Sequence, residues 1–566
     1  MNTTVTERVN TVRKTILPSR RTHETPRLLQ ADAYTIGADE FQATKAREKS
    51  VYYVTFRRNL IDINKVLYTE NDNRIVFVGL QRILERILYK PITHAEIDET
   101  VRFLKHAKVT LNGFQEYEFP EQMWRTVVDE FNGYPPIKIS AMPEGSIVYP
   151  NEPIIMIEST TSHEQFGVYF GEMAAWFESK ILHVYGASER ATQDRHWLLK
   201  LIEMVNMVNP NLPYAEKKFL ASLMLTDFGD RAGLNQMESE DLGMTHLYNF
   251  GGTDTFSGAY QAWKNSNETV GIFSSVNALA HRNVQAYKFE GDCYKTMYGN
   301  AKRFEFLSMV SDCYNYKNAI EKYIMPLAVK SSVDKDDKIL VARPDSGDPK
   351  EQILWSIRLA IKNGLYRKET INGKEWYFGT TFRMIEGDGM THEVMWDIMM
   401  AMIEEGFAPY GWLLFGVGGG NRNSLKRDNL SAKYALCAVG YDYSPVCKFS
   451  ETMGKTTLGG YFKVLRNPEA LKNCTTIVNN DEEGENAMVV YYNVYDNESM
   501  YTPFGINGGQ EDDFNVIKAR IDNQFEFMPL TLKTDNNHNY PASDKILNIR
   551  RKLLNKYDPS KNGSDY

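Results

Sequence analysis

Residues 339–349 read ILVARPDSGDP and give the clearest indication of the fold. The segment begins with an apolar run of strand length, and Pro344 and Pro349 bracket a polar corner because proline cannot donate to a strand ladder. Residues 351–362 then place apolar side chains near helical spacing, and Asn363-Gly364 supplies a stop. The stretch therefore predicts one strand, one glycine-containing corner and one helix.

The same unit recurs downstream. Residues 382–385 and 412–415 are apolar runs, followed by the corners Gly387-Asp388-Gly389 and Gly416 to Gly420, and residues 394–405 have helical spacing. Similar corners lie upstream at 226–233, 247–255, 275–281 and 309–312. Strands separated by helices favour parallel pairing, which brings their carboxyl ends to one mouth. We therefore predict an α/β fold with an irregular (β/α) barrel.

Short strands bounded by Pro and Gly occur near both ends of the chain, at 137–140, 153–157, 434–439, 459–465 and 488–495. Their similar rhythm predicts a second α+β domain built from the N- and C-terminal parts. The expected divisions are a flexible N-terminal extension (1–30), the first part of the α+β domain (31–180), the barrel (181–432), the second part of the α+β domain (433–533) and a polar tail (534–566) with a short helix at 543–556. We also expect helices over 76–88 and 166–181.

Composition excludes several classes of protein. The chain has 566 residues, 42% of them hydrophobic and 24% charged, which is ordinary for a globular protein with two or more domains. A net charge of -8 argues against a general nucleic-acid binder, and no apolar run is long enough for a membrane span. The five cysteines have no metal-finger spacing, so we expect free thiols in a reducing cytoplasm.

Five aspartates stand at predicted strand ends, namely Asp254, Asp312, Asp345, Asp348 and Asp388. A single aspartate in such a loop is usually a helix cap or part of a turn. Carboxylates that converge on one mouth can instead bind Mg²⁺ through water, order ribose hydroxyls or accept an amide N–H. Their number at one predicted edge favours a binding site.

A glycine run with nearby cations points to an anionic ligand at the same edge, and His281 and Phe228 are further candidate site residues. Gly418-Gly419-Gly420 lets a backbone approach a ligand closely, although such a run is often only a flexible turn, and Arg343 and Arg427 lie near it. His281 can be a structural histidine, a proton carrier or a nucleophile. Phe228 can belong to the core or stack on a flat ring. Dinucleotide-binding, P-loop, zinc-protease and hydrolase motifs are absent from the sequence.

The motifs DFGDRAG, HLYNFGGTDT, ARPDSGDP, EGDG and FGVGGG…LKRD occur in this order between residues 227 and 428. With them the sequence resembles the nicotinamide phosphoribosyltransferase family, part of the type II phosphoribosyltransferases, over roughly residues 32–465. The resemblance implies that nicotinamide displaces pyrophosphate from 5-phosphoribosyl 1-pyrophosphate, with Mg²⁺ required, to form nicotinamide mononucleotide in NAD salvage. It also implies a homodimer whose active sites use residues of both chains.

The resemblance assigns the base-binding side residue by residue. Phe228 stacks on one face of nicotinamide, and Tyr34 of the other subunit stacks on the opposite face. Arg231 and Asp254 lie near the ring, and Asp254 accepts from the carboxamide N–H₂. Aromatic faces on both sides would align a flat, weakly nucleophilic ring for attack.

On the donor side the resemblance implies that Arg343 holds the substrate, that Gly387 and Asp388 receive the ribose hydroxyls and that Gly418 and Gly419 cradle the 5′-phosphate. Arg427 binds phosphate or pyrophosphate. Such cations suit the negative charge that develops on pyrophosphate as the anomeric bond breaks. Further pyrophosphate candidates are Arg58 and Lys433.

The catalytic positions that the resemblance implies are His281, Asp312 and Asp345, with Ser308 close to the reacting centre. In the family a histidine can be phosphorylated by ATP, which drives the reaction forward, and His281 is the matching position. Asp345 matches a residue that supports the ribose and the metal region. The Mg²⁺ is expected to be held through the substrate pyrophosphate.

The sequence departs from the family pattern at several positions. Ala280 stands where the family has a glutamate, so His281 lacks an expected orienting carboxylate. Thr35, Thr226 and Ala232 replace the family's lysine, histidine and glycine. Two alternatives stay open: a nicotinate phosphoribosyltransferase, which Asp254 disfavours because a carboxylate repels the nicotinate carboxylate, and a non-catalytic binding or signalling protein on the same fold.

Overall fold

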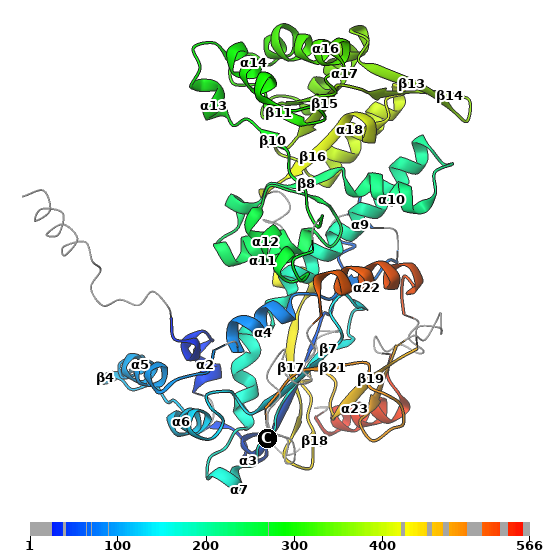
Figure 1. Cartoon of the computed structure of the whole chain (residues 1–566). Coiled ribbons are helices and arrows are strands. Elements are labelled where there is room, and N and C mark those ends of the chain that lie inside the picture. Colours follow the sequence, from blue (N-terminus) through cyan, green and yellow to red (C-terminus); the bar gives the residue numbers. More distant parts are fainter. Residues whose placement is uncertain are drawn as a thin grey trace, which may run out of the picture.

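In the computed structural model the chain forms two lobes, one around a parallel sheet and one around an antiparallel sheet (Figure 1). The long helix α9 (Val184–Val208) lies between them. The structure describes residues 25–37, 41–63, 65–68, 71–88, 90–269, 271–419, 425–449, 456–467, 475–494, 512–532 and 541–557.

The upper lobe contains a parallel sheet of seven strands in the order β10-β11-β12-β15-β16-β8-β9. An isolated parallel bridge joins Gly252 of β9 to Ser274, three residues before β10, and so brings the two edges of the sheet together. The sheet therefore curls as the predicted irregular barrel requires. Its strands are β8 (Leu225–Asp227), β9 (Gly252–Thr253), β10 (Asn277–Ala278), β11 (Phe306–Val310), β12 (Ile339–Arg343), β15 (Phe382–Glu386) and β16 (Leu413–Val417).

Helices connect the parallel strands, and their starts follow from local sequence. Asp348 caps α17 (Pro349–Lys362) by accepting the Glu351 N–H at 2.8 Å, and Thr391 caps α18 (His392–Glu404) by accepting the Val394 N–H at 3.4 Å. Both helices begin within two residues of the predicted positions. The other helices of this lobe are α10 (Tyr214–Ser222), α11 (Gln236–His246), α12 (Phe256–Lys264), α13 (His281–Gln285), α14 (Glu290–Asn300), α15 (Tyr316–Ala319), α16 (Met325–Asp334) and α19 (Pro409–Trp412).

One hairpin of the upper lobe was not predicted. Strands β13 (Tyr366–Ile371) and β14 (Lys374–Gly379) pair antiparallel, and Asn372 and Gly373 connect them with positive φ values of 50° and 79°. An Asn-Gly pair between two strand-like runs is a strong hairpin signal because both residues tolerate positive φ. The signal was present in the sequence.

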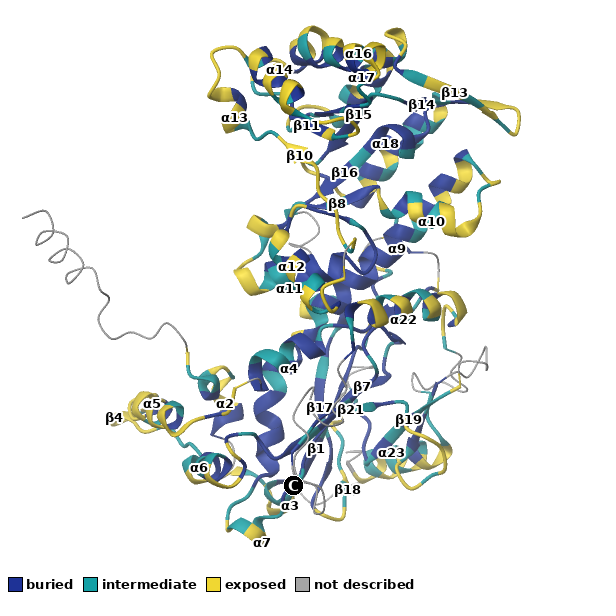
Figure 2. Cartoon of the chain, viewed as in Figure 1, coloured by how far each residue is buried: buried dark blue, intermediate teal, exposed yellow. Residues whose placement is uncertain are grey.

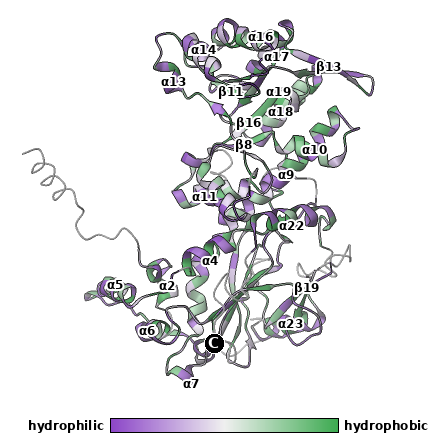
Figure 3. Ribbon diagram, in the orientation of Figure 1, coloured by the Kyte–Doolittle hydropathy of each residue, from purple (hydrophilic) through white to green (hydrophobic). Residues whose placement is uncertain are grey.

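The lower lobe contains a sheet of six strands in the order β18-β17-β1-β7-β5-β21, in which neighbouring strands are antiparallel. It confirms that the two ends of the chain build one α+β unit. Every residue of β7 is buried, and Figures 2 and 3 show buried, hydrophobic strands at the centre of this lobe. The strands are β1 (Ser50–Thr55), β5 (Ile137–Ala141), β7 (Pro153–Ser159), β17 (Lys433–Val439), β18 (Ser444–Pro445) and β21 (Val489–Asn493).

Smaller elements surround this sheet. They are the 3₁₀ turn Arg27–Leu29, α2 (Ala33–Ile36), α3 (Thr44–Glu48), β2 (Ile75–Val76), α4 (Leu80–Leu88), α5 (His94–Leu104), β3 (Lys108–Thr110), β4 (Gly113–Gln115), α6 (Glu121–Glu130), β6 (Ile147–Val148), α21 (Arg427–Leu430), β19 (Phe462–Arg466), β20 (Thr475–Asn479), α22 (Phe514–Phe527) and α23 (Asp544–Tyr557). The helix predicted at 543–556 corresponds to α23.

The single helix predicted over residues 166–181 is wrong. The chain instead forms α7 (His163–Phe166), a 3₁₀ helix (Gly171–Phe177) and α8 (Glu178–Ile181). Gly167 ends α7 with a φ of 69°, and a side chain at Gly171 would meet the Ala46 carbonyl oxygen at 1.9 Å. Close backbone packing therefore overrides the helical spacing. The predicted helix over 76–88 also begins late, at Leu80, because Val76 belongs to β2.

Two further observations concern the described residues. None of their helices combines the length and the apolar character that a membrane crossing needs. Their four cysteines, Cys293, Cys313, Cys437 and Cys447, are free thiols. The fifth, Cys474, lies outside the described residues.

Candidate active site

His281 lies between two carboxylates beyond the carboxyl ends of β11 and β12. Its Nε2 is 3.2 Å from Asp312 Oδ1, and its Nδ1 is 3.9 Å from Asp345 Oδ2. Ser346 donates its hydroxyl to the second oxygen of Asp312 at 2.6 Å. The His281 side chain is 39% exposed, so an imidazole supported by a carboxylate remains accessible. This arrangement suits a proton carrier or a nucleophile.

The backbone before His281 is held by two neighbouring strands. The Leu279 N–H donates to the Ser308 carbonyl at 2.9 Å, and Arg343 Nη2 donates to the Leu279 carbonyl at 2.8 Å. Ser308 is buried in β11, and Arg343 is the last residue of β12. The Nε of Arg343 is buried without a hydrogen-bond partner among the described residues. Arg343 therefore connects the His281 corner to the Asp345 corner and keeps donor capacity.

The corner after β15 is organised by a carboxyl group that the sequence analysis did not assign. Glu386 Oε1 accepts the N–H groups of Gly387 at 3.0 Å and Asp388 at 3.3 Å, and Glu386 is only 2% exposed. The pKa of Glu386 is raised to about 7, first by burial and then by the carboxylates of Asp345 and Asp388, and the two hydrogen bonds oppose the rise. Because β12 and β15 pair in parallel, Asp345 and Asp388 follow neighbouring strands at the mouth.

Phe228 packs on the glycines of two other corners. A side chain at Gly416 would meet the Phe228 ring at 1.9 Å, and one at Gly387 would meet it at 3.3 Å. The Phe228 N–H donates to the Val417 carbonyl at 2.8 Å, which places the Phe228 backbone beside the half-buried Gly418. Gly416 requires glycine because the aromatic ring occupies the space of a Cβ, and a Cβ at Gly387 would contact the same ring tightly. Gly419 is also half-buried, and Gly420 lies outside the described residues.

Asp254 and Arg231 lie on exposed corners that follow β9 and β8. The Asp254 N–H donates to the Asp227 carbonyl at 2.9 Å, and Ser275 donates its hydroxyl to Asp254 Oδ1 at 2.5 Å. Because an ionised carboxylate has about four acceptor positions, Asp254 can still accept from a ligand N–H. Arg231 belongs to the short 3₁₀ turn Asp230–Ala232.

The remaining predicted residues lie on the lower lobe. We call Arg58, Arg427 and Lys433 the cationic cluster. The N–H of Arg58 donates to the carbonyl of Leu430 at 3.1 Å, at the end of the short helix α21 that Arg427 begins. Burial lowers the pKa of Lys433, the neighbouring cations, Arg427 among them, lower it further, and Glu178 opposes them. Figure 1 shows β17, which Lys433 begins, in the lower part of the view and β11, β15 and β16 in the upper part.

Tyr34 belongs to the same region as the cationic cluster. Its side chain is 60% exposed. The pKa of Tyr34 is raised, first by desolvation and then by Glu178 and Asp32, and Arg427 opposes the rise. One chain therefore holds the predicted residues as two groups, one at the barrel mouth and one on the lower lobe.

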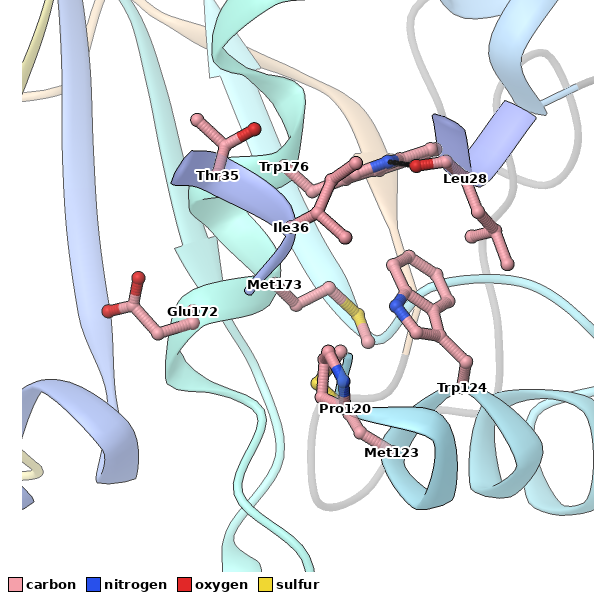
Figure 4. A pocket seen from close by; sticks show the side chains of 9 residues that line it. All are labelled: Leu28, Thr35, Ile36, Pro120, Met123, Trp124, Glu172, Met173 and Trp176. Carbon is pink, nitrogen blue, oxygen red and sulfur yellow. Dashed lines mark hydrogen bonds between the residues drawn. The ribbon is translucent and has the colours of Figure 1, made fainter. Parts of the chain in front are cut away.

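The helix α2 that carries Tyr34 sits on a small apolar cavity (Figure 4). The Trp176 indole N–H donates to the Leu28 carbonyl at 3.3 Å, and Met173 and Trp124 line the same cavity. Thr35 is buried here and donates its hydroxyl to the Asp32 carbonyl at 2.8 Å. The threonine thus closes the first turn of α2 and leaves Tyr34 directed outward.

Three site residues were missed by sequence reasoning. Glu386 ends an apolar strand, and an acidic residue at that position was the signal. Ser346 and Ser275 had no signal stronger than their place in a corner. Asp348, by contrast, acts as a helix cap, so the ordinary interpretation of a loop aspartate holds there.

Comparison with known proteins now adds to this geometry. The profile of the nicotinate phosphoribosyltransferase (NAPRTase) family matches residues 223–495, and that of the nicotinamide phosphoribosyltransferase N-terminal domain matches residues 27–139. Nicotinamide phosphoribosyltransferase of Xanthomonas campestris pv. campestris (strain 8004) is 28% identical over 448 residues, which cover 78% of this chain and 87% of the relative. The enzyme of the same name from Mycoplasma pneumoniae is 23% identical over 335 residues, which cover 50% of this chain and 68% of the relative.

Solved structures show the same fold. Human nicotinic acid phosphoribosyltransferase has a TM-score of 0.53 at 12% identity and covers 92% of this chain and 99% of its own. Nicotinate-nucleotide pyrophosphorylase from Pyrococcus furiosus has a TM-score of 0.51 at 13% identity, with 91% and 99% coverage. The fold is therefore that of solved nicotinate-type phosphoribosyltransferases. In sequence, the chain is similar to nicotinamide phosphoribosyltransferases, as the N-terminal-domain profile and both relatives indicate.

Proposed function

We propose that this chain transfers the 5-phosphoribosyl group from 5-phosphoribosyl 1-pyrophosphate to nicotinamide, which yields nicotinamide mononucleotide and pyrophosphate in NAD salvage. The observation that carries the proposal is the meeting of His281, Asp312, Asp345 and Asp388 at one mouth of a parallel barrel in a chain similar to nicotinamide phosphoribosyltransferases. The ring nitrogen of nicotinamide attacks the anomeric carbon, and the bond from that carbon to pyrophosphate breaks.

The residues at the mouth suit the two partners of this reaction. Phe228 offers an aromatic face to nicotinamide, and Asp254 accepts from its carboxamide N–H₂. Asp388 accepts from the ribose hydroxyls, and the backbone at Gly418-Gly419 receives the 5′-phosphate. Because positive charge develops on the ribose as the bond breaks, the carboxylates around His281 stabilise that state electrostatically.

Mg²⁺ fits the donor set at the mouth. It prefers one or two carboxylates together with substrate phosphates and water. Among the described residues, no three His, Cys, Asp or Glu side chains are gathered into a site made by protein alone. We infer that Asp345 approaches the ion and that the pyrophosphate supplies the other ligands. Bound there, the ion would neutralise charge on the leaving group.

ATP coupling through His281 is part of the proposal. The family's glutamate is Ala280 here, but Asp312 lies 3.2 Å from one ring nitrogen and Asp345 lies 3.9 Å from the other. These carboxylates orient the imidazole. An exposed, oriented imidazole can accept a phosphoryl group on a ring nitrogen, with ADP as the leaving group.

We further propose a homodimer in which the cationic cluster and Tyr34 of one chain complete the barrel mouth of the other. Within one chain these two groups lie on different lobes. Large apolar side chains are exposed near the base-binding corners: Leu234 is 91%, Met237 55%, Phe256 62% and Phe273 36% exposed. An exposed apolar patch of this kind suits burial against a second copy. The free thiols are compatible with a cytoplasmic location.

The test is pyrophosphate release by the purified chain with Mg²⁺ and the phosphoribosyl donor, with nicotinamide or nicotinate as acceptor, each with and without ATP. We expect turnover of nicotinamide to exceed that of nicotinate and ATP to stimulate it. Equal rates with both acceptors would favour the nicotinate alternative, which the fold neighbours support. No release with either acceptor would favour a non-catalytic protein.

A further inference from the structure

A fully buried network of charged and polar groups lies beneath the base-binding corners. Arg190 and Asp194 come from α9, His246 from α11, Asp227 from β8, and Thr255 follows the β9 corner. Each of the five is 0% exposed. Arg190 Nε donates to Asp194 Oδ2 at 2.7 Å, and Arg190 Nη2 lies 3.0 Å from His246 Nδ1 and 3.6 Å from Asp227 Oδ1.

The network reaches both base-binding corners directly. Thr255 donates its hydroxyl to Asp227 Oδ2, and the N–H of Asp254 donates to the Asp227 carbonyl at 2.9 Å. His246 Nε2 lies 3.1 Å from the Gly252 carbonyl oxygen, so this nitrogen carries a proton and donates. Asp227 immediately precedes Phe228, and Thr255 immediately follows Asp254. Phe228 and Asp254, the two residues assigned to bind nicotinamide, are therefore each joined to a residue of the network by one peptide bond.

Stability alone does not account for these groups. Removing charges from water costs several kcal/mol per ion, and buried ion pairs are often no more stabilising than apolar residues of equal volume. Burial acts to raise the pKa of Asp194, but Arg190 and His246 outweigh it and keep the pKa lowered. These pairings form together only in one arrangement of the four elements, and Arg190 Nη1 and Asp194 Oδ1 are buried without a hydrogen-bond partner among the described residues. Such a network specifies the relative positions of the corners that it connects.

We propose that the network of Arg190, Asp194, His246, Asp227 and Thr255 is a positioning device that fixes Phe228 and Asp254 relative to each other and thereby sets the affinity for nicotinamide. The inference rests on the proposed function. None of the five residues is assigned to contact the substrate. They act through the two corners. The parts of the donor half on β12 and β15 lie outside their direct contacts, whereas β16, which precedes Gly418, pairs with β8 at Val417 and Asp227.

The test compares Thr255→Val with Thr255→Ser in the full chain. Valine keeps the volume but removes the hydroxyl that Asp227 accepts from, whereas serine keeps the hydroxyl. Because a buried carboxylate then loses a hydrogen bond, we expect the KM for nicotinamide to rise about 10-fold in the valine variant. The KM for the phosphoribosyl donor should stay within about twofold, and serine should restore both values.

The matched control is Tyr298→Phe. Tyr298 donates its hydroxyl to Asp336 Oδ2 at 2.6 Å, so the same kind of hydrogen bond is removed at the opposite, amino-terminal end of β12. This variant should keep both KM values. If Thr255→Val does not fold, Asp227→Asn removes the charge of the accepting carboxylate with the shape retained and should also raise the KM for nicotinamide.

The outcomes separate the two proposals. An unchanged KM for nicotinamide in Thr255→Val, or an equal rise in both KM values, would overturn the positioning role and leave the proposed function standing. Failure of serine to restore the KM would also overturn it. If the wild type releases no pyrophosphate, the proposed function fails and this inference fails with it.

Discussion

The mouth of the barrel and the cationic cluster have opposite chemistry. At the mouth, His281 lies between Asp312 and Asp345, and Glu386, whose pKa is raised to about 7, is buried at the end of β15. The cationic cluster instead presents positive charge on the lower lobe, close to an exposed tyrosine. The difference indicates that two separate groups of residues bind the phosphoribosyl donor: the carboxylates bind its sugar, and the cations bind its pyrophosphate.

The largest effect is expected when the cations of the cationic cluster are removed. Replacing Arg427 and Lys433 together by alanine should lower kcat/KM by about 100-fold, because two charge-assisted contacts to pyrophosphate are lost in a desolvated site. The measurement is steady-state pyrophosphate release with the donor varied. A loss below about threefold would show that the cationic cluster does not contact the donor.

Subunit mixing sharpens the same prediction. Phe228→Ala damages only the mouth, and the Arg427/Lys433 double variant damages only the cationic cluster. If the groups come from different chains, a mixed dimer contains one intact site, so co-refolded variants should recover about a quarter of the wild-type rate. No recovery above the sum of the separate variants would contradict the shared site.

A smaller effect concerns the base. Asp254→Asn should reduce the preference for nicotinamide over nicotinate by about 10-fold. The asparagine side chain does not repel the carboxylate of nicotinate, and nicotinamide loses a charged acceptor for its carboxamide N–H₂. The check is the ratio of kcat/KM for the two acceptors. Ser275→Ala is a suitable control, because it removes the hydroxyl that Asp254 accepts from and keeps the charge. An unchanged ratio in Asp254→Asn would remove Asp254 from the base-binding role.

The parallel half of the fold could be predicted because its signals are local. Strand, corner and helix repeat within short windows, and caps such as Asp348 act on the next turn. The break at Gly167 and Gly171 could not be predicted, since it depends on a carbonyl of Ala46, more than a hundred residues away in sequence. Helical spacing carries no information on such a contact.

Prediction of the candidate site from the sequence has the same limit. Residues at strand ends, such as Asp312 and Asp345, could be found because parallel strands bring their carboxyl ends together. Glu386 escaped because its role depends on burial, and the network around Arg190 escaped because α9 reads as an ordinary helix until its neighbours are known. The placement of Arg427 near Tyr34 could not be predicted either, because the two residues are far apart in the sequence.

ATP coupling should respond to His281 alone among the histidines. His281→Ala should abolish stimulation by ATP and leave some ATP-independent synthesis, because the phosphoryl acceptor is lost while the donor contacts remain. His94→Ala is a matched control, since His94 forms a similar pair with Asp129 at 2.8 Å on the lower lobe. Initial rates with and without ATP decide the question, and stimulation that persists in His281→Ala would refute the phosphohistidine role.

The smallest expected effect is a pH dependence of the free energy of unfolding that arises from Glu386 at the mouth. The pKa of Glu386 is raised to about 7 in the folded chain, above its ordinary value near 4.5. Between these two values the folded state binds more protons than the unfolded state, so the contribution of Glu386 to stability falls as pH rises from about 4.5 to about 7.

Glu386→Gln keeps an acceptor for the N–H groups of Gly387 and Asp388 and removes the titration. The difference in unfolding free energy between variant and wild type should therefore shift in favour of the variant from about pH 5 to about pH 8, as measured by denaturant unfolding at both values. Glu144 and Glu189, whose pKa values burial also raises to about 7, cancel in this difference. A difference that is the same at both pH values would show that Glu386 remains ionised at the mouth, and the mouth would then carry one more negative charge to set against the cationic cluster.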